Sequence, residues 1–185
     1  MINVKNIVIS MSVTVVLALS LPAQADWKEW FSLDRAKEII QVNNPVYEDE
    51  CGSCHFAYQP GLLPKASWEK LMDGKALEDH FGDNAELDDA VRAEIERFLV
   101  ENAADDAASK RSKKIMASLR EDLAPIRITK VPFIVSRHEE IPDRLISGNP
   151  KVKSLSQCQQ CHQDIKNGVY DDDTVYIAGH GYFED

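Results

Sequence analysis

The chain has 185 residues, of which 31 are acidic and 21 are basic, so its formal net charge at pH 7 is −10. This charge disfavours binding to nucleic acids and to anionic membrane surfaces, both of which attract basic proteins. It favours instead a protein partner with a basic surface. The length is sufficient for one medium-sized domain or two small ones.

The first 25 residues have the pattern of a secretory signal peptide. One early charge, Lys5, precedes an apolar run from Ile7 to Leu21, and the segment ends in Ala23-Gln24-Ala25. This ending predicts cleavage before Asp26, which removes one positive charge and changes the net charge from −10 to −11. An uncleaved anchor is the alternative, but the apolar run is short for a stable span. We therefore expect an exported protein that is not membrane-spanning after cleavage.

All four cysteines lie in two copies of the pattern Cys-x-x-Cys-His, at residues 51–55 and 158–162. This pattern is the attachment signature of c-type haem. Each thiol adds to one haem vinyl group, and the adjacent histidine binds the iron. We therefore expect two covalently bound haem c groups, and because such attachment takes place outside the bacterial inner membrane, we expect a periplasmic location. The predicted haem-attaching residues are Cys51, Cys54, Cys158 and Cys161, and the predicted proximal iron ligands are His55 and His162.

Other uses of a Cys-x-x-Cys pair fit this chain less well. A thioredoxin-like redox pair needs no trailing histidine and follows a strand in a βαβ pattern, which is not found near either copy. A structural zinc ion takes four ligands, and a long loop would have to bring the two distant pairs together. A disulfide within Cys-x-x-Cys is usually reactive rather than structural.

Helical patterns predominate in the first half of the mature chain. Residues 26–43 are predicted to form an amphipathic helix, and Asn44 to cap a helix from Pro45 that leads into the first motif. Ser67 is predicted to cap the next helix. Residues 83–86 resemble a capping box before a strongly amphipathic helix, which should pack across the helix of the first motif.

A polar stretch at residues 102–114 indicates a domain boundary. We therefore expect a signal peptide at 1–25, an N-terminal haem c domain at 26–104 and a C-terminal haem c domain at 105–185. The basic cluster of Lys110, Arg111, Lys113 and Lys114 is interpreted as a solvated helix face, with a docking patch as the alternative.

The second half is less regular. Residues 126–135 are predicted to be an extended segment or an edge strand. Ser154 or Ser156 is expected to cap a helix that carries the second motif, and Gly168 is expected to end it. The tail from residue 169 onwards is acidic and aromatic and contains His180.

The sixth ligand of each iron decides the chemistry, because an open site can bind a small molecule. For the first haem we expect His80, which lies 25 residues after His55 in the sequence, with Met72 as the alternative. For the second haem we expect His138, with His180 as a competitor in a tail that is less rigidly supported.

Several segments together resemble the dihaem cytochrome c family of exported bacterial electron carriers. They are residues 51–60 and 63–68, the His80-Phe-Gly-Asp-Asn-Ala run, residues 126–129, His138 and the second motif. The resemblance implies a mainly α fold of two small haem-binding domains, the first similar to class I cytochrome c and the second irregular with little secondary structure. It also implies bis-histidine ligation of both irons, with His80 and His138 as the distal ligands.

The resemblance further implies the redox partners, which are a membrane cytochrome b as electron donor and a soluble monohaem, oxygen-binding c-type cytochrome as acceptor. We expect an electron carrier and not an enzyme, because spare histidines suffice to fill both irons and neither motif has an acid, a base and a substrate pocket beside it. The alternative is a haem enzyme or gas-binding sensor with one open iron.

Overall fold

The helix that leads into the first motif begins where the sequence predicts. The computed structural model describes residues 38–120 and 123–183, and in it the side chain of Asn44 accepts a hydrogen bond of 3.0 Å from the backbone N–H of Tyr47. Pro45 occupies the first turn of this helix, α2, where its missing N–H has no intrahelical partner to lose. The helix ends at Gly52, inside the motif, so the two cysteines lie at its C-terminal end.

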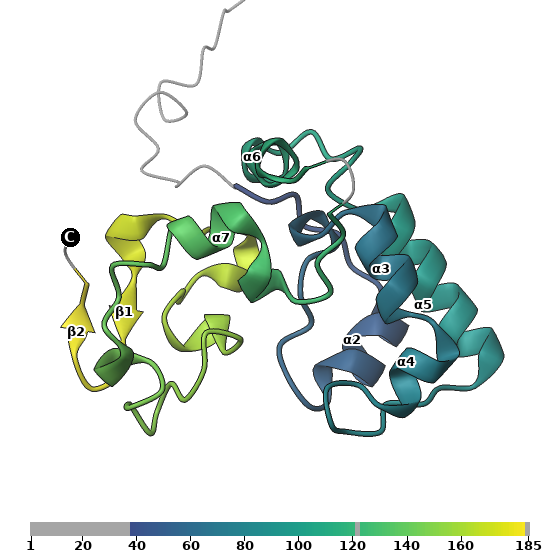
Figure 1. The fold of residues 1–185 in the computed structure, drawn as a ribbon, viewed down its shortest axis with the longest axis horizontal. Coiled ribbons are helices and arrows are strands. Elements are labelled where there is room, and N and C mark those ends of the chain that lie inside the picture. The colour runs from purple at the N-terminus through teal and green to yellow at the C-terminus, as the bar shows by residue number, and fades with distance from the viewer. Residues whose placement is uncertain (1–37, 121–122, 184–185) are drawn as a thin grey trace, which may run out of the picture. The chain divides into compact units, whose positions relative to one another are not determined.

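The described residues are mainly helical (Figure 1). The α-helices are α2 (Pro45–Gly52), α3 (Lys65–Leu71), α4 (Gly74–Glu78), α5 (Asp89–Glu101), α6 (Lys110–Ser118) and α7 (Pro132–Ser136). Short 3₁₀ helices cover Pro60–Leu62, Ile128–Lys130, Asp143–Leu145, Cys158–Gln160, Ile165–Asn167 and Asp172–Thr174. Strands β1 (Tyr176–Ile177) and β2 (Gly181–Tyr182) form an antiparallel hairpin in which Tyr176 is opposite Tyr182.

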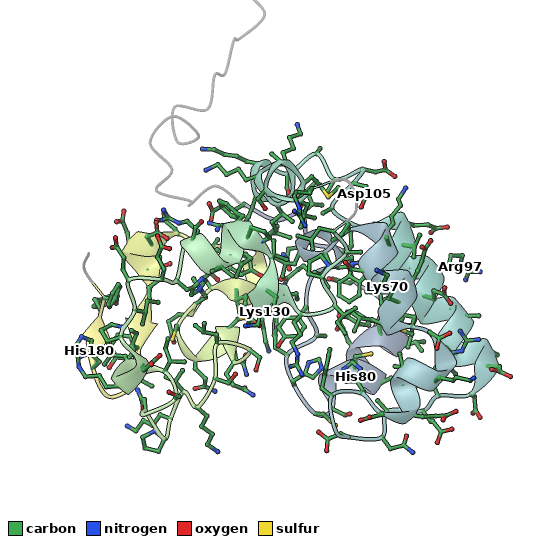
Figure 2. The ribbon with its side chains drawn as sticks, in the orientation of Figure 1. Lys70, His80, Arg97, Asp105, Lys130 and His180 are labelled. Atoms are coloured by element: carbon green, nitrogen blue, oxygen red, sulfur yellow. The ribbon has the colours of Figure 1, made fainter. Side chains whose placement is uncertain are left out.

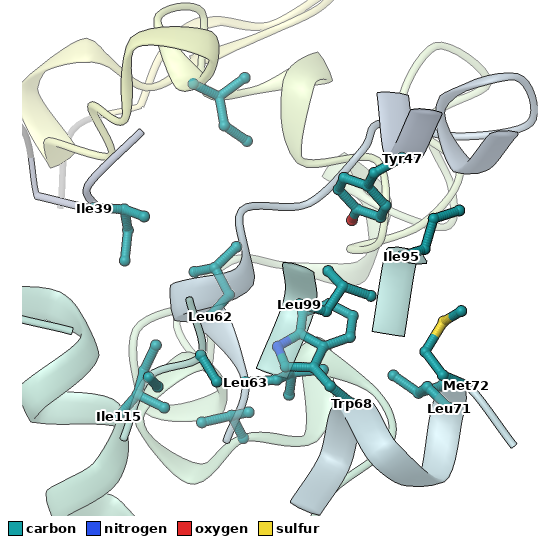
Figure 3. Packing of buried hydrophobic residues seen from close by; sticks show 14 of the residues in the cluster. Ile39, Tyr47, Leu62, Leu63, Trp68, Leu71, Met72, Ile95, Leu99 and Ile115 are labelled. Atoms are coloured by element: carbon teal, nitrogen blue, oxygen red, sulfur yellow. The ribbon is translucent and has the colours of Figure 1, made fainter. Parts of the chain in front are cut away.

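The core is built around Trp68 of α3, which is 5% exposed (Figure 3). Its indole N–H donates a hydrogen bond of 2.8 Å to the carbonyl of Pro60, so the one polar atom of the ring is satisfied inside the core. The rest of the ring is free to pack among apolar side chains. The cluster of buried hydrophobic residues that contains Trp68 also includes Leu63, Leu71, Met72, Ile95 and Leu99.

The amphipathic helix predicted to follow residues 83–86 is α5, and it packs against both α2 and α3. Ile95 and Leu99 are buried on its inner face. The rings of Tyr47 and Phe98 lie 5.6 Å apart between α2 and α5. The predicted packing of this helix across the helix of the first motif is therefore confirmed.

Three helix boundaries in the first half differ from the prediction. Residues 38–43 are not helical, because the backbone N–H groups of Glu38 and Ile39 donate to the carbonyl of Gly168 at 2.9 and 3.2 Å. Ser67 lies inside α3 and does not cap it. The residues predicted as a capping box form a local turn, in which the backbone N–H of Glu86 donates to Asn84, and α5 begins only at Asp89.

The predictions for the second half are partly wrong. Residues 126–135 form a 3₁₀ turn and α7 instead of a strand, with Pro132 in the first turn of the helix. The second motif lies in a 3₁₀ helix, Cys158–Gln160, and the predicted serine-capped α-helix is absent there. Gly168 does end a short helix, at a φ of +77° that favours glycine. The hairpin was not predicted, and it joins the second motif because the N–H of Tyr176 donates to the carbonyl of Cys161 at 3.0 Å.

The signal peptide and most of the first predicted helix lie outside the described residues. Among the residues that are described, no helix is both long and apolar enough to cross a membrane. Buried side chains from both sides of residue 104 share one cluster, which contains Leu62 and Leu63 together with Ile115, Val131 and Tyr170. The domain boundary between residues 104 and 105 stays a prediction.

Candidate haem sites

The first motif places His55 opposite His80. The two imidazole rings have centroids 6.3 Å apart and planes inclined by 21°. His55 follows α2, and His80 follows α4 in a tight turn in which its backbone pairs with Asp83 in both directions. Figure 2 shows His80 in the turn that follows α4. The two histidines that the sequence assigns to the first haem therefore face each other.

His55 has a fixed tautomer. Its Nδ1 lies 2.8 Å from the carbonyl oxygen of Phe56, which can only accept, so Nδ1 carries the proton. Nε2 therefore keeps its lone pair and is the nitrogen available to a metal. The ring of Tyr58 stacks on His55 with centroids 5.1 Å apart and holds the imidazole in orientation.

The surroundings of His80 favour the neutral imidazole that metal ligation requires. Burial lowers the pKa of His80, and the nearby His55 and Arg127 lower it further, while Asp83 opposes them. Phe81 packs against the imidazole at 4.7 Å between centroids. The guanidinium of Arg127 covers the Phe81 ring at 3.8 Å. Met72, the alternative ligand, is 3% exposed and packs in the apolar cluster (Figure 3).

The second motif has an equivalent pair. The rings of His138 and His162 have centroids 6.1 Å apart, but their planes are inclined by 76°. Nδ1 of His138 lies 2.7 Å from the carbonyl oxygen of Ile134, at the end of α7, so this nitrogen is protonated and Nε2 is free. The short helix that replaced the predicted strand thus positions the second distal candidate.

A cavity of about 690 Å³ surrounds this second pair. Its volume is in the range of about 300–1,000 Å³ that is typical of small-molecule sites. His138, His162, Cys158 and Cys161 all line it, whereas His180 does not. His180 lies in the turn of the hairpin between β1 and β2 (Figure 2).

His162 is kept neutral by its environment. Burial is the main cause that lowers its pKa to about 4, with smaller contributions from His138 and Arg111, and Asp172 opposes them. Its Nδ1 is buried and has no hydrogen-bond partner among the residues described. The ring of Tyr170 lies 5.3 Å away. A neutral imidazole with an unsatisfied buried nitrogen suits a metal ligand.

None of the four cysteines forms a disulfide, so all four are available for haem attachment. Before attachment, burial raises the pKa of Cys51 and of Cys158 to about 11 and also raises that of Cys161, so these three thiols are protonated near neutral pH. The described residues contain no cluster of three or more histidine, cysteine or carboxylate side chains that could hold a bare metal ion.

The histidine separations fit an iron held between two imidazoles. A metal–imidazole bond is about 2 Å long, and roughly 1 Å more separates the nitrogen from the ring centre, so two rings on opposite sides of a metal have centres about 6 Å apart. The observed values are 6.3 and 6.1 Å. Each motif thus combines two cysteines, an adjacent histidine and a second histidine at a distance that one metal ion between the two rings would span.

A chain of buried polar contacts joins the two sites. The hydroxyl of Tyr58, which stacks on His55, donates to the carbonyl of Ser156 at 2.6 Å, close to the second motif. Its neighbour Gln59 donates to the carbonyl of Ile165 at 3.2 Å and accepts from the hydroxyl of Tyr170 at 2.5 Å. No local pattern in the sequence indicates these contacts, because the bonded residues are 98, 106 and 111 positions apart.

The comparisons with known proteins agree with this geometry. The family model described as "Dihaem cytochrome c" matches residues 47–170. The solved dihaem cytochrome type c of Shewanella baltica is 41% identical to this chain, with 78% of this chain and 100% of that one covered and a TM-score of 0.63. A dihaem cytochrome c from Rhodobacter sphaeroides is 37% identical, with 70% of this chain and 98% of that one covered and a TM-score of 0.61.

A second structure from Rhodobacter sphaeroides is 35% identical, with 71% of this chain and 100% of that one covered and a TM-score of 0.55. A comparison with curated proteins found no significant match. The mainly helical fold, the two motifs, the family match and the structural relatives lead to one assignment. The chain belongs to the dihaem cytochrome c family and is an electron-transfer haem protein that carries two covalently attached haem c groups.

Proposed function

We propose that this protein is a periplasmic electron relay in which each iron is held by two histidines. Cys51 and Cys54 attach the first haem, with His55 and His80 as its iron ligands. The second haem is attached at Cys158 and Cys161, and its ligands are His138 and His162. When bound, each haem supplies an iron that accepts and releases one electron.

The observation that carries the proposal is the separation of about 6 Å within both histidine pairs. It supports an iron with both axial positions filled, which has no vacant site for oxygen, peroxide or nitric oxide. The chain's contribution is to hold the imidazoles. Tyr58 stacks on His55, and the backbone carbonyls of Phe56 and Ile134 fix the tautomers of His55 and His138.

Absorption and EPR spectra of the purified holoprotein test this ligation. Two low-spin haems that do not bind carbon monoxide when reduced are the expected result. A high-spin haem, or ready binding of carbon monoxide, would instead favour an enzyme or a gas sensor with one open iron.

The proposed partners are a membrane cytochrome b, which supplies electrons, and a soluble monohaem c-type cytochrome, which receives them. The formal charge of −10 favours a basic docking surface on a partner. Electron transfer between acidic and basic partners is steered by charge and slows as ionic strength rises. Stopped-flow oxidation of the reduced holoprotein by a basic monohaem cytochrome c should show this decline, and a rate independent of salt would contradict it.

Export is part of the proposal, with the signal peptide at residues 1–25 removed. Mass spectrometry of the holoprotein from a periplasmic fraction should give a chain that begins at Asp26 and carries two haems. A chain that retains Lys5 would contradict cleavage.

A further inference from the structure

Arg111 points into the protein, although its neighbours in the basic cluster point outward. It lies in the first turn of α6 and lines the cavity that also contains His162 and Tyr170. Its side chain is 11% exposed, whereas Lys110 and Lys113 are exposed residues. The sequence predicts that Arg111 lies on a solvated helix face, and this prediction is wrong.

The guanidinium of Arg111 is held from several sides. Its terminal nitrogen donates to the carboxylate of Glu38 at 2.5 Å and to the carbonyl of Tyr170 at 3.4 Å. The rings of Tyr170 and Phe133 lie 5.3 and 5.6 Å from its central carbon. Glu38 is itself anchored, because its carboxylate also accepts from the backbone N–H of Tyr170 at 3.1 Å. The position of the charge is thus fixed in the cavity wall.

Both hydrogen bonds of this guanidinium come from one terminal nitrogen, Nη2, so its other N–H donors have no partner among the described residues. Its Nε–H is buried and has no hydrogen-bond partner among the residues that the structure describes. A guanidinium has five N–H donors, and a buried charged donor without an acceptor is costly. The carboxylate of Glu38 is engaged at a terminal nitrogen, and Arg111 lines the cavity, so a group that fills the cavity can offer an acceptor to the N–H donors that the described residues leave unpaired.

The group that fills this cavity carries carboxylates of its own. Haem has two propionate side chains, and arginine binds carboxylates through charge-assisted hydrogen bonds. Two other cations line the cavity, but Lys130 is exposed and Arg137, which is 45% exposed, is paired with Asp172. Arg111 is the most buried of the three.

We infer that Arg111 binds a propionate carboxylate of the second haem through the unpaired N–H groups of its guanidinium, and that Glu38 is the positioning residue that holds the guanidinium. The inference rests on the proposed function, because it concerns the haem that His138 and His162 would hold. It adds a binding residue that lies outside the motifs and far from both histidines in the sequence.

The charges of Arg111 and Glu38 should shift the reduction potential of the second haem in opposite directions. A cation beside the iron disfavours the more positive ferric state, so loss of the Arg111 charge should lower the potential of the second haem. Loss of the Glu38 charge should raise it, because Arg111 is then less well compensated. Each tenfold change in the one-electron equilibrium corresponds to about 59 mV.

The test uses the holoprotein with both haems attached. Arg111→Gln, Glu38→Gln and the control Lys110→Gln, an exposed cation in the same helix turn, are titrated potentiometrically with EPR to separate the two haems. We expect Arg111→Gln to lower the reduction potential of the second haem, with at least a threefold decrease in the equilibrium constant for its reduction. Glu38→Gln should raise this potential. Lys110→Gln should leave the potentials of both haems unchanged. A shift shared equally by both haems, or no shift, would overturn the inference.

A second readout addresses the carboxylate itself. Redox-difference infrared spectra, recorded with haem labelled by carbon-13 at its carboxyl groups, should contain a carboxylate band that shifts in Arg111→Lys, which keeps the charge but lacks the guanidinium, and not in Lys110→Gln. An unshifted band would overturn the assignment. If Arg111→Gln does not accumulate as folded holoprotein, the inference is tested by the infrared spectrum of Arg111→Lys and by the potentiometric titration of Glu38→Gln.

The two proposals fail separately. If the wild-type haems are low-spin, and substitution of Arg111 changes neither the reduction potential of the second haem nor the carboxylate band, the role of Arg111 is overturned and the proposed relay stands. A high-spin second haem in the wild-type protein would overturn the bis-histidine ligation, while the Arg111-dependent carboxylate band would still be measurable.

Discussion

The hydroxyl of Tyr170 donates a hydrogen bond of 2.5 Å to Oε1 of Gln59, across 111 positions of sequence. Both residues are 6% exposed, so neither polar group has water as a substitute partner. The ring of Tyr170 lies beside that of His162 in the second motif, and Gln59 follows Tyr58, whose ring stacks on His55 in the first. This single bond therefore ties the surroundings of the two haems together.

Replacing Tyr170 with phenylalanine should destabilise the fold. The change removes the donor and leaves the buried oxygen of Gln59 without it, which costs about 1–3 kcal/mol. Urea unfolding followed by far-ultraviolet circular dichroism measures the loss. Tyr182→Phe is the control, since Tyr182 is 68% exposed, and it should change the unfolding free energy by less than about 0.5 kcal/mol. Equal effects of the two substitutions would contradict a special role for the Gln59 contact.

Replacing His80 with alanine should convert the first haem to high spin, because the chain then offers no second imidazole opposite His55. Both haems should remain covalently attached, since the cysteines are untouched. Absorption spectra and carbon monoxide binding measure the change. Met72→Leu conserves core volume and should leave the spectra unchanged; loss of the low-spin signal in that variant would reassign the ligand to methionine.

Replacing His138 should have the same effect on the second haem, and replacing His180 should have none. His138 lies 6.1 Å from His162 and lines the cavity, while His180 lies in the hairpin turn outside it. The two alanine variants, compared by EPR, separate the assignments. A high-spin signal in His180→Ala with an unchanged His138→Ala would reverse them.

The two haems should differ in their EPR signals. The imidazole planes are inclined by 21° at the first site and by 76° at the second. Nearly parallel rings split the iron d orbitals in the same direction and give a rhombic signal, whereas crossed rings cancel this splitting and give a more anisotropic one with a larger maximum g value. The hydrogen bonds that hold the rings preserve the difference. Two identical rhombic signals would contradict these ring orientations.

Gly168→Ala should destabilise the second site. Gly168 has a φ of +77°, and an added Cβ would lie 2.3 Å from the carbonyl oxygen of Ile39. The left-handed conformation alone costs a non-glycine residue about 1–2 kcal/mol, and the clash with backbone adds to it. Gly179→Ala is a matched control, because its φ is +86° and its Cβ would meet only a lysine side chain at 3.9 Å. Thermal unfolding should show a larger loss for Gly168→Ala; equal losses would exclude the clash.

The sequence predicts those parts of the protein that depend on local chemistry. The haem motifs, the Asn44 cap and the amphipathic α5 are set by residues a few positions apart, and the structure contains all three. His80 and His138 could be nominated because few spare histidines exist, and the structure brings each opposite a motif histidine.

Features that depend on contacts between residues far apart in the sequence could not be predicted from local patterns. Residues 126–135 alternate loosely as a strand would, yet Pro132 begins a helix whose end supports His138. Arg111 stands among surface residues in the sequence, and its burial comes from contacts with Glu38, Phe133 and Tyr170, which are distant in the sequence. The second motif has only a short 3₁₀ helix, and its backbone pairs at Cys161 and His162 with Tyr176 and Val175, which the local sequence of the motif does not indicate.

The attachment of residues 38–39 to Gly168 and to α6 bears on the order in which the two sites would mature in the export that we propose. His55 and His80 lie close together in the sequence, so the first site can assemble once a short N-terminal portion has crossed the membrane. The second site needs Glu38 and Gln59 from the beginning of the described chain together with Tyr170 from near its end. Its completion must wait for almost the whole polypeptide, and a defect in late translocation should yield molecules that are native at the first haem alone.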